Sequence, residues 1–410
     1  MNFVADIAII GGGASGLAAA ITAKRLSPSA KVYIFEALDR VGKKLITTGN
    51  GRCNITNRNL NRFHSENLKF AYSVLNGVGN EGIECFFESI GIPLTFEGDK
   101  AYPSSLQASS VVDCLRFECE RLGVNTVCGC KIRDVKFGNA FTLYAEDTVI
   151  TAKSVICCAG LYSGGDKLGS DGAFFRFLKE KGFKTVKLSP AIVQLKTETD
   201  FVKQLKGIKV DALAQLYCGN QKVAEEFGEV LFCDYGLSGP AILNISREVG
   251  RSERAHTVSL DLFSETDIEH LYKILEKRAT LLKHRTLEDF FTGMLNKRLG
   301  QVVLKYCGFS LSDAVASLES AKLHKIANTL KGFSFKATGN TGFINSQVTA
   351  GGISTDEFYP DTLMSKKNRG FFACGEILDV DGDCGGFNLA WAWCSGITAA
   401  KSAVKYIGDL

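Results

Sequence analysis

The chain has 410 residues, of which 45% are hydrophobic and 22% are charged, a composition typical of globular proteins. A chain of this length is expected to form two or three structural units, each with its own core. The 48 Lys and Arg residues outnumber the 44 Asp and Glu residues by only four, and a net charge of +4 is too small to predict a nucleic-acid partner.

The beginning of the chain and its cysteines indicate a cellular compartment. The first residues, MNFVADIAII, lack the basic region of a signal peptide and are interpreted as a buried strand. Fourteen scattered cysteines then favour a reducing, cytoplasmic location. No run of about 18 apolar residues occurs, so no membrane span is expected. The five histidines lack ligand spacing, so no metal site is predicted, and the oligomeric state stays open.

The first predicted elements are a strand over 6–10, a helix over 17–26 and a strand over 32–35, which together form a β-α-β unit. The turn before the helix matches G-x-G-x-x-G. In such turns the first two glycines let the backbone approach a pyrophosphate, the third lets the helix pack on the strand, and the helix N-terminus faces the phosphates. The predicted cofactor-binding residues here are Gly11, Gly13, Ala14, Ser15 and Gly16.

Glu36 ends the second predicted strand, where its carboxylate can accept hydrogen bonds from ribose hydroxyls. An acid at this position favours FAD or NAD over NADP. A second glycine-rich stretch follows over 40–57 and is rich in hydrogen-bond donors; the alternative is an ordinary mobile loop. Its predicted cofactor-binding residues are Lys43, Lys44, Thr48, Gly49, Gly51, Arg52, Cys53 and Asn54.

The middle of the chain changes character twice. A helix is predicted over 108–121, capped by Ser109 or Ser110 and ended by Gly123, and short strands are predicted over 127–135, 141–145 and 154–160. Alternating apolar residues then predict a β-rich insert over about 190–262. Helical spacing follows over about 266–330, including 268–275 and 287–295, and predicts a small helical bundle. A last core strand over 370–375 precedes a C-terminal helix.

Several segments make the chain resemble a known family, the HI0933-like or BaiN-like NAD(P)/FAD-dependent oxidoreductases. The resemblance extends over nearly the whole chain, and its most specific segment is the last, because its length and glycine placement are hard to reach by chance. The segments are GGGASGLAAA at 11–20, GNGRCNITN at 49–57, YPSSLQASSVVDCL at 102–115, LFCDYGLSGPAIL at 231–243, TAGGIS at 349–354 and GEILDVDGDCGGFNLAWAWCSG at 375–396.

The resemblance implies where FAD binds. The segment 375–381 would lie along the ribityl and pyrophosphate parts, and 385–388 would open a helix directed at the pyrimidine edge, where its dipole favours the reduced, anionic flavin. For Asn388, a helix cap is an alternative or additional role. The strand ending at 160 would pass under the dinucleotide, and Lys131 or a neighbour would meet the adenine. The residues implied are Lys131, Ala159, Gly160, Gly375, Glu376, Asp379, Asp381, Gly386, Phe387 and Asn388.

Together, the element pattern and the resemblance predict an α/β fold with an insert. A Rossmann-like FAD/NAD(P)-binding domain is expected over 1–190 and 345–410. The insert over 191–344 would contain a small β-barrel, about 191–264 and 333–344, and a helical bundle, about 265–332.

Two residues are candidates for catalysis. Tyr235 lies in a glycine-punctuated loop and is a candidate proton donor, with a structural hydroxyl as the alternative. Arg52 is the second candidate. Family members commonly have Thr-His where this chain has Cys233-Asp234, so a role for that histidine is not carried over. The chain has no C-x-x-C motif, and Cys128 and Cys130 are expected on one strand face, so a dithiol mechanism is disfavoured.

These features predict an FAD-dependent oxidoreductase that transfers a hydride through flavin N5. We expect an NAD(P)H-linked reductase of a small apolar organic substrate, for which the resemblance suggests a conjugated C=C bond. NAD(P)H would be a transient electron donor that docks against the flavin, because no second dinucleotide turn is present. One alternative is a flavin-dependent oxidase of an amine-type substrate. The other is a flavin-containing RNA-modification or RNA-binding protein, which the near-neutral charge disfavours.

Overall fold

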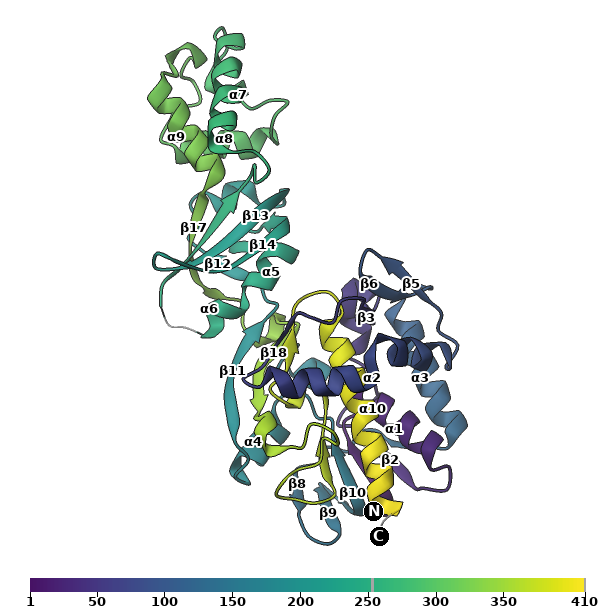
Figure 1. The fold of residues 1–410 in the computed structure, drawn as a ribbon. Helices are drawn as coiled ribbons and strands as arrows, with labels where there is room; N and C mark the ends of the chain where they lie inside the picture. Colours follow the sequence, from purple (N-terminus) through teal and green to yellow (C-terminus); the bar gives the residue numbers. More distant parts are fainter. Residues whose placement is uncertain (252–253, 409–410) are drawn as a thin grey trace. The chain divides into compact units, whose positions relative to one another are not determined.

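The computed structural model describes residues 1–251 and 254–408 (Figure 1). The chain forms two compact units. The first consists of Met1–Ser189 and Gln347–Leu410, and the second of Pro190–Ser346. No helix in the described part of the chain is long and apolar enough to cross a membrane.

A seven-stranded sheet forms the centre of the first unit, in the order β7-β2-β1-β10-β9-β8, with β19 also paired to β10. The pairs that join β7, β2, β1, β10 and β19 are parallel, whereas β8 and β9 form an antiparallel extension beside β10. The strands are β1 (Asn2–Ile10), β2 (Val32–Phe35), β7 (Asn125–Val127), β8 (Asp134–Lys136), β9 (Phe141–Ala145), β10 (Thr148–Cys157) and β19 (Phe371–Ala373).

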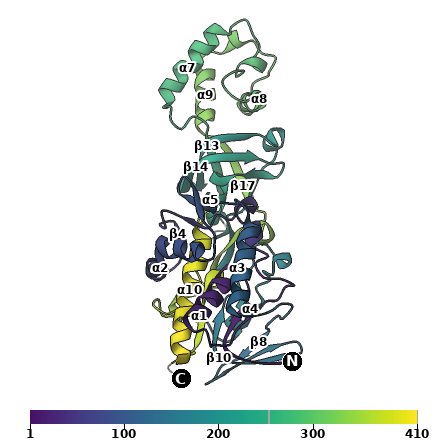
Figure 2. The same ribbon diagram turned by 90° about the vertical axis from the view of Figure 1, so that its right-hand side faces the viewer.

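The helices of this unit include a closely packed pair, α1 (Ala14–Leu26) and α10 (Phe387–Gly408), which lie side by side in Figures 1 and 2. Small residues allow the close approach. Ala18, Ala19 and Ala20 are fully buried, and a Cβ atom at Gly396 would lie only 2.4 Å from the backbone oxygen of Ser15. The other helices are α2 (Leu68–Glu88), α3 (Ala108–Leu122) and α4 (Ala173–Glu180).

Three small sheets complete the first unit. Two of them bring distant segments together, because β4 pairs with β20 and β11 pairs with β18. The third has the order β3-β6-β5. Their strands are β3 (Thr56–Asn57), β4 (Phe63–His64), β5 (Leu94–Glu97), β6 (Lys100–Pro103), β11 (Thr185–Ala191), β18 (Val348–Ile353) and β20 (Asp381–Gly382).

The second unit is built on a closed barrel with the strand order β12-β15-β14-β13-β16-β17. Alternate residues of its strands, such as Ala212, Ala214 and Leu216, fill the interior, as a closed barrel requires. The predicted class, an α/β Rossmann-like fold with an inserted β-barrel, is confirmed. The barrel strands are β12 (Leu195–Thr197), β13 (Lys209–Cys218), β14 (Gln221–Phe232), β15 (Gly236–Ser238), β16 (His256–Asp261) and β17 (Phe333–Asn340).

Three helices follow one another between β16 and β17 and pack together (Figure 2): α7 (Ile268–Leu281), α8 (Lys297–Tyr306) and α9 (Ser320–Lys331). Two shorter helices, α5 (Pro240–Ile245) and α6 (Arg247–Arg251), precede β16. The predicted helix over 287–295 is wrong beyond a single 3-10 turn at Leu287–Asp289. The apolar residues at helical spacing lie in an irregular segment, in which Phe290 and Phe291 are buried without a helix.

The strand predicted over 127–135 is also wrong. The chain leaves β7 at Val127 and enters β8 only at Asp134. In between, Gly129 adopts a φ of +69°, and the N–H of Cys130 donates to the carbonyl of Glu36 at 2.8 Å, so this stretch is a loop tied to the end of β2. Cys128 and Cys130 therefore do not share a strand face; the first is exposed and the second is buried.

The predicted helix after residue 107 forms, but its N-cap differs from the expectation. Gln107 rather than a serine occupies the N-cap of α3. At its other end Gly123 adopts the left-handed conformation with a φ of +72°, which confirms the predicted stop.

Candidate functional site

The glycines in the turn between β1 and α1 differ in the space around their Cβ positions. Gly11 has a φ of +99°, and its Cβ would lie 2.6 Å from the carbonyl oxygen of Cys158. A Cβ at Gly16 would lie 2.0 Å from the oxygen of Gly11. At Gly13, by contrast, no described atom beyond the adjoining residues and the helix's own backbone lies within 4 Å of a Cβ position. The fold itself needs Gly11 and Gly16, whereas the space beside Gly13 suits a ligand such as a pyrophosphate.

Glu36 at the end of β2 holds this turn in place. Its Oε2 accepts a hydrogen bond from the N–H of Gly12 at 2.7 Å, and its Oε1 accepts one from the N–H of Leu38 at 2.9 Å. Two carboxylate oxygens offer about four acceptor positions, so the side chain keeps capacity for the ribose hydroxyls predicted from the sequence. The structure thus adds a positioning role to the predicted binding role.

Residues Leu45–Gly51 form a short 3-10 segment with an unusual backbone. Gly49, Asn50 and Gly51 have positive φ values of 57°, 54° and 82° in succession, which glycine tolerates and asparagine accepts. The Thr48 hydroxyl donates to the carbonyl of Leu45 at 2.7 Å. This predicted cofactor loop is therefore a tight turn built on three consecutive residues with left-handed backbone angles.

Lys44 and Glu376 come from opposite ends of the chain and form an ion pair with 2.5 Å between Nζ and Oε2. The hydroxyl of Ser163 accepts from Lys44 Nζ at 2.5 Å and donates to Glu376 Oε1 at 2.5 Å. The N–H of Thr349 also donates to Glu376 Oε1, at 3.2 Å. The predicted residues Lys44 and Glu376 thus belong to one network, whereas Lys43 only approaches Asp39 at 3.5 Å.

The guanidinium of Arg52 forms an ion pair with Glu97 and lies 4.4 Å from the centre of the Tyr102 ring. The hydrogen bond from Arg52 lowers the pKa of the Glu97 carboxyl, and the same contact raises the pKa of Arg52. Arg52 is therefore a permanent cation directed at these partners. The next residue, Cys53, is fully buried, and desolvation raises the pKa of its thiol to about 12.

This burial predicts a clear order of thiol reactivity. At pH 8 a thiol with a pKa of about 12 is ionised in about one molecule in ten thousand, so iodoacetamide should leave Cys53 and Cys157 unlabelled while it labels the exposed Cys85. Peptide mass spectrometry would measure the labelling, with urea-unfolded protein as the control in which all three react. Labelling of Cys53 as fast as Cys85 would contradict the structure.

The C-terminal segment reaches the N-terminal turn at Gly375. A Cβ there would lie 2.5 Å from Ser15 Oγ, and the N–H of Gly375 donates to Ser395 Oγ at 2.9 Å. Further along, buried Asp379 accepts from the N–H of Glu66 at 2.9 Å, and buried Asp381 lies in β20 opposite His64. Predicted residues from both ends of the chain are therefore neighbours in the first unit.

The first turn of α10 confirms that the segment 385–388 opens a helix. Gly386 has a φ of +100°, and its Cβ would lie 2.6 Å from the carbonyl oxygen of Thr56. Asn388 accepts from the N–H of Gly382 at 2.8 Å and donates to its carbonyl at 2.6 Å, so it fixes the preceding loop. Phe387 packs edge-on against Phe63 with 5.6 Å between ring centres.

Asn54 lies against this helix start. Its Oδ1 is buried and has no hydrogen-bond partner among the described residues, and it would lie 2.8 Å from a Cβ at Gly386. Buried polar atoms are nearly always paired in native proteins, so an unpaired acceptor marks a place where a donor from a ligand belongs. This atom and the open space beside Gly13 fit a bound dinucleotide.

The remaining predicted cofactor residues follow the ends of two strands of the central sheet, β10 and β7. Ala159 approaches the glycine turn, with its Cα 3.3 Å from the Cβ position of Gly11. Gly160 has a φ of +66° and leaves open space in the described structure where its Cβ would stand. Lys131 lies in the loop after β7, and its side chain forms an ion pair with Asp171.

Tyr235 belongs to the second unit, whereas the predicted cofactor residues belong to the first. It precedes β15, and its carbonyl accepts from the N–H of Thr197 at 3.1 Å. Partial burial, together with the side chain of Cys233, raises the pKa of its phenol to about 12. The hydroxyl is protonated at neutral pH and interacts with the side chain of Cys233.

The structure also reveals a polar cluster that the sequence reasoning missed. Asp383 lies between β20 and α10 and pairs with His64, 2.7 Å away, and with Arg62, 2.6 Å away. Arg62 and His64 follow the segment 49–57, so only the pairing of β4 with β20 brings them to Asp383. The repeated aspartates at 379, 381 and 383 were the one signal of a polar ribbon there.

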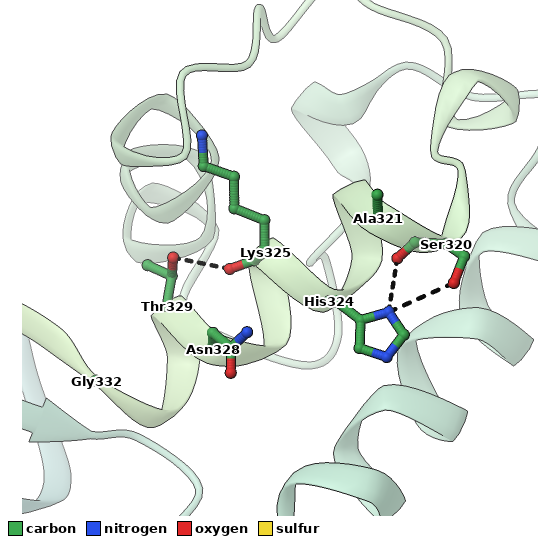
Figure 3. A pocket seen from close by; sticks show the side chains of 7 residues that line it. All are labelled: Ser320, Ala321, His324, Lys325, Asn328, Thr329 and Gly332. Carbon is green, nitrogen blue, oxygen red and sulfur yellow. Dashed lines mark hydrogen bonds between the residues drawn. The ribbon is translucent and has the colours of Figure 1, made fainter.

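A cavity of about 790 Å³ lies on α9 in the second unit (Figure 3). Within α9, His324 Nδ1 donates to the carbonyl of Ser320 at 2.9 Å and Thr329 Oγ1 donates to that of Lys325 at 2.9 Å. None of its lining residues was predicted from the sequence to bind the cofactor or act in catalysis. They are Ser320, Ala321, His324, Lys325, Asn328, Thr329 and Gly332.

The amino-acid sequence is similar to those of known proteins. Residues 5–402 match the family described as HI0933-like protein Rossmann domain. The chain is 35% identical to the 3-dehydro-bile acid delta(4,6)-reductase of Clostridium scindens, with 97% of this chain and 99% of that protein covered. It is 26% identical to the ribosomal RNA dihydrouridine synthase of Haemophilus influenzae, with 98% and 99% covered.

Among solved structures, the open conformation of a flavocytochrome c3 fumarate reductase has a similar fold. The TM-score is 0.50 at 15% sequence identity, with 99% of this chain and 79% of that chain covered. At this identity the similarity concerns the fold, which is that of a flavoprotein.

Proposed function

Since this chain belongs to the HI0933-like protein family and is an FAD-dependent oxidoreductase, we propose that it reduces a carbon–carbon double bond conjugated to a carbonyl group in a small apolar molecule. The observation that carries this proposal is the 35% identity to a 3-dehydro-bile acid delta(4,6)-reductase over 97% of the chain. When bound, FAD would supply the hydride chemistry. A steroid-like dienone or enone is the proposed substrate class.

The residues of the first unit would hold the cofactor. The turn at Gly11–Gly16 would bind the pyrophosphate with the N–H groups of α1, and Glu36 would orient the ribose while it holds the turn. The pair of Lys44 and Glu376 would fix the flavin-side segment relative to the N-terminal loop. The helix start at α10 would place positive potential at the pyrimidine edge.

Two groups would act on the substrate or near it. The phenol of Tyr235 is protonated at neutral pH, as that of an ordinary tyrosine also is, and its role would be to donate a hydrogen bond to the substrate carbonyl or a proton to the neighbouring carbon. Arg52 stays cationic beside Glu97 and would stabilise negative charge that develops in the site.

The experiment that tests this function uses the FAD-loaded protein under anaerobic conditions. NADH or NADPH is expected to bleach the visible absorbance of the flavin, and a 4,6-dien-3-one steroid is expected to restore it while its own double bond is reduced. A saturated 3-oxo steroid serves as the control and should restore nothing. If neither nucleotide bleaches the flavin but an amine does, the oxidase alternative replaces the reductase.

A second candidate function is the reduction of uridine in ribosomal RNA. The observation in its favour is the full-length similarity to a ribosomal RNA dihydrouridine synthase, at 26% identity. A uracil ring also presents a double bond conjugated to a carbonyl group, so the chemistry would be related. Incubation of unmodified ribosomal RNA with the reduced protein, followed by mass spectrometry of the nucleosides, separates the two candidates. Dihydrouridine without steroid reduction would favour the RNA substrate.

A further inference from the structure

Two thiols from distant parts of the chain meet inside the first unit. Cys158 directly follows β10 and Cys374 directly follows β19, and their Sγ atoms lie 3.3 Å apart. The two cysteines are 216 positions apart in the sequence. Because the chain has no C-x-x-C motif, this pair is created by the fold, through the parallel pairing of β10 with β19.

The backbone of each cysteine is already fixed where a disulfide would need it. The N–H of Cys158 donates to the carbonyl of Ile10 at 2.8 Å, and the N–H of Cys374 donates to the carbonyl of Cys157 at 3.0 Å. Neighbouring strands lie about 4.8 Å apart, which is within the range of Cα separations that disulfides span. Since the sulfurs of a disulfide are about 2.05 Å apart, only a small movement of the two side chains is needed to form the bond.

The two thiols differ in their access to solvent. Cys158 is 6% exposed, whereas Cys374 is fully buried. Burial, together with the side chain of Cys374, raises the pKa of the Cys158 thiol, so its reactive thiolate is scarce at neutral pH. Cys158 is therefore the sulfur that a small oxidant reaches first, and it reacts slowly. Cys374 is placed to react with the oxidised sulfur next.

We propose that Cys158 and Cys374 form a reversible disulfide when the protein is exposed to hydrogen peroxide. The Cys158 thiolate attacks the peroxide, so that an S–O bond forms, the O–O bond breaks and the released hydroxide takes up a proton to become water. The Cys374 sulfur then attacks the sulfenic acid, so that the S–S bond forms, the S–O bond breaks and a second water leaves. In total the two thiols lose two electrons and two protons, and the peroxide gains them. This inference rests on neither the proposed substrate nor the bound cofactor.

The disulfide joins the two parts of the first unit covalently. This unit consists of Met1–Ser189 and Gln347–Leu410, and the whole second unit lies between these parts in the chain. A cross-link that closes so long a loop removes much conformational freedom from the unfolded chain. Because both cysteines are already held in the sheet, the folded state loses little in return. We expect the melting temperature to rise by about 5 °C or more on oxidation.

The test starts from FAD-loaded protein whose exposed thiols, such as that of Cys85, have been blocked with N-ethylmaleimide. After prolonged exposure to hydrogen peroxide, peptide mass spectrometry without a reductant is expected to find Cys158 linked to Cys374 with the loss of two hydrogens. Dithiothreitol should restore both thiols and the lower melting temperature. Cysteines that stay reduced, or that become sulfinic or sulfonic acids without a link, would overturn the proposal in the wild-type protein alone.

Serine variants assign the roles of the two sulfurs. Cys374→Ser should accumulate a sulfenic acid at Cys158, which dimedone traps, and its melting temperature should not rise on oxidation. In Cys158→Ser, dimedone should leave the buried Cys374 unlabelled. Cys157→Ser is the matched control, because Cys157 is as buried as Cys374, and this variant should still form the link. Loss of the link in Cys157→Ser would assign the bond to Cys157 and contradict the proposed pair.

Discussion

Replacing Gly13 with valine is expected to abolish FAD binding and leave the apo-protein folded. The backbone of Gly13 has a φ of −79°, which valine adopts without strain, and no described atom beyond the adjoining residues and the helix's own backbone lies within 4 Å of its Cβ position. The added side chain would instead occupy the space assigned to the pyrophosphate. We expect affinity for FAD to fall at least about 100-fold, which corresponds to about 3 kcal/mol. Fluorescence titration with FAD measures the loss.

The matched control for this variant is Gly77→Val in α2. Gly77 also has open space within 4 Å of its Cβ position in the described structure, but it lies outside the predicted cofactor residues. The control should bind FAD as the wild-type protein does, and both apo-proteins should melt within a few degrees of wild type. Full FAD binding by Gly13→Val would show that the pyrophosphate lies elsewhere.

Replacing Gly396 with valine is expected to have the opposite effect, a loss of stability whether or not FAD is present. The Cβ would lie 2.4 Å from the backbone oxygen of Ser15, and a backbone atom cannot move aside as a flexible side chain can. Helices α1 and α10 would have to separate. We expect the free energy of unfolding to fall by about 3 kcal/mol, as for a severely overpacked core, and urea denaturation of the apo-protein measures this.

Gly408→Val in the same helix serves as the comparison. No described atom beyond the neighbouring part of α10 lies within 4 Å of the Cβ position of Gly408, so this change should leave the free energy of unfolding within about 0.5 kcal/mol of wild type. A Gly396→Val protein as stable as Gly408→Val would mean that α1 and α10 do not cross as closely as described. Together, the two variants test whether Gly13 is needed for FAD binding and Gly396 for helix packing.

The family resemblance inferred from the sequence is confirmed, and so is the α/β class with an inserted barrel. The family and the fold class were both predicted from patterns within short segments of the sequence. The strand before Gly11, the helix after it and the strand before Glu36 lie within about 30 residues, and their signals of burial and turn geometry are local. Apolar spacing was misleading at 287–295, because Phe290 and Phe291 are buried there without a helix.

The amino-acid sequence by itself determined the glycine turn between β1 and α1, the order of the main elements and the family, because each depends on residues close together in the chain. Only the tertiary structure decided the partners of these residues. Glu376 meets Lys44 across 332 positions of the chain, and Asn54 meets the start of α10 across a similar separation. Such contacts depend on how the sheet and helices pack, which no local pattern specifies. For the same reason, the unpaired acceptor of Asn54 became visible only in the folded chain.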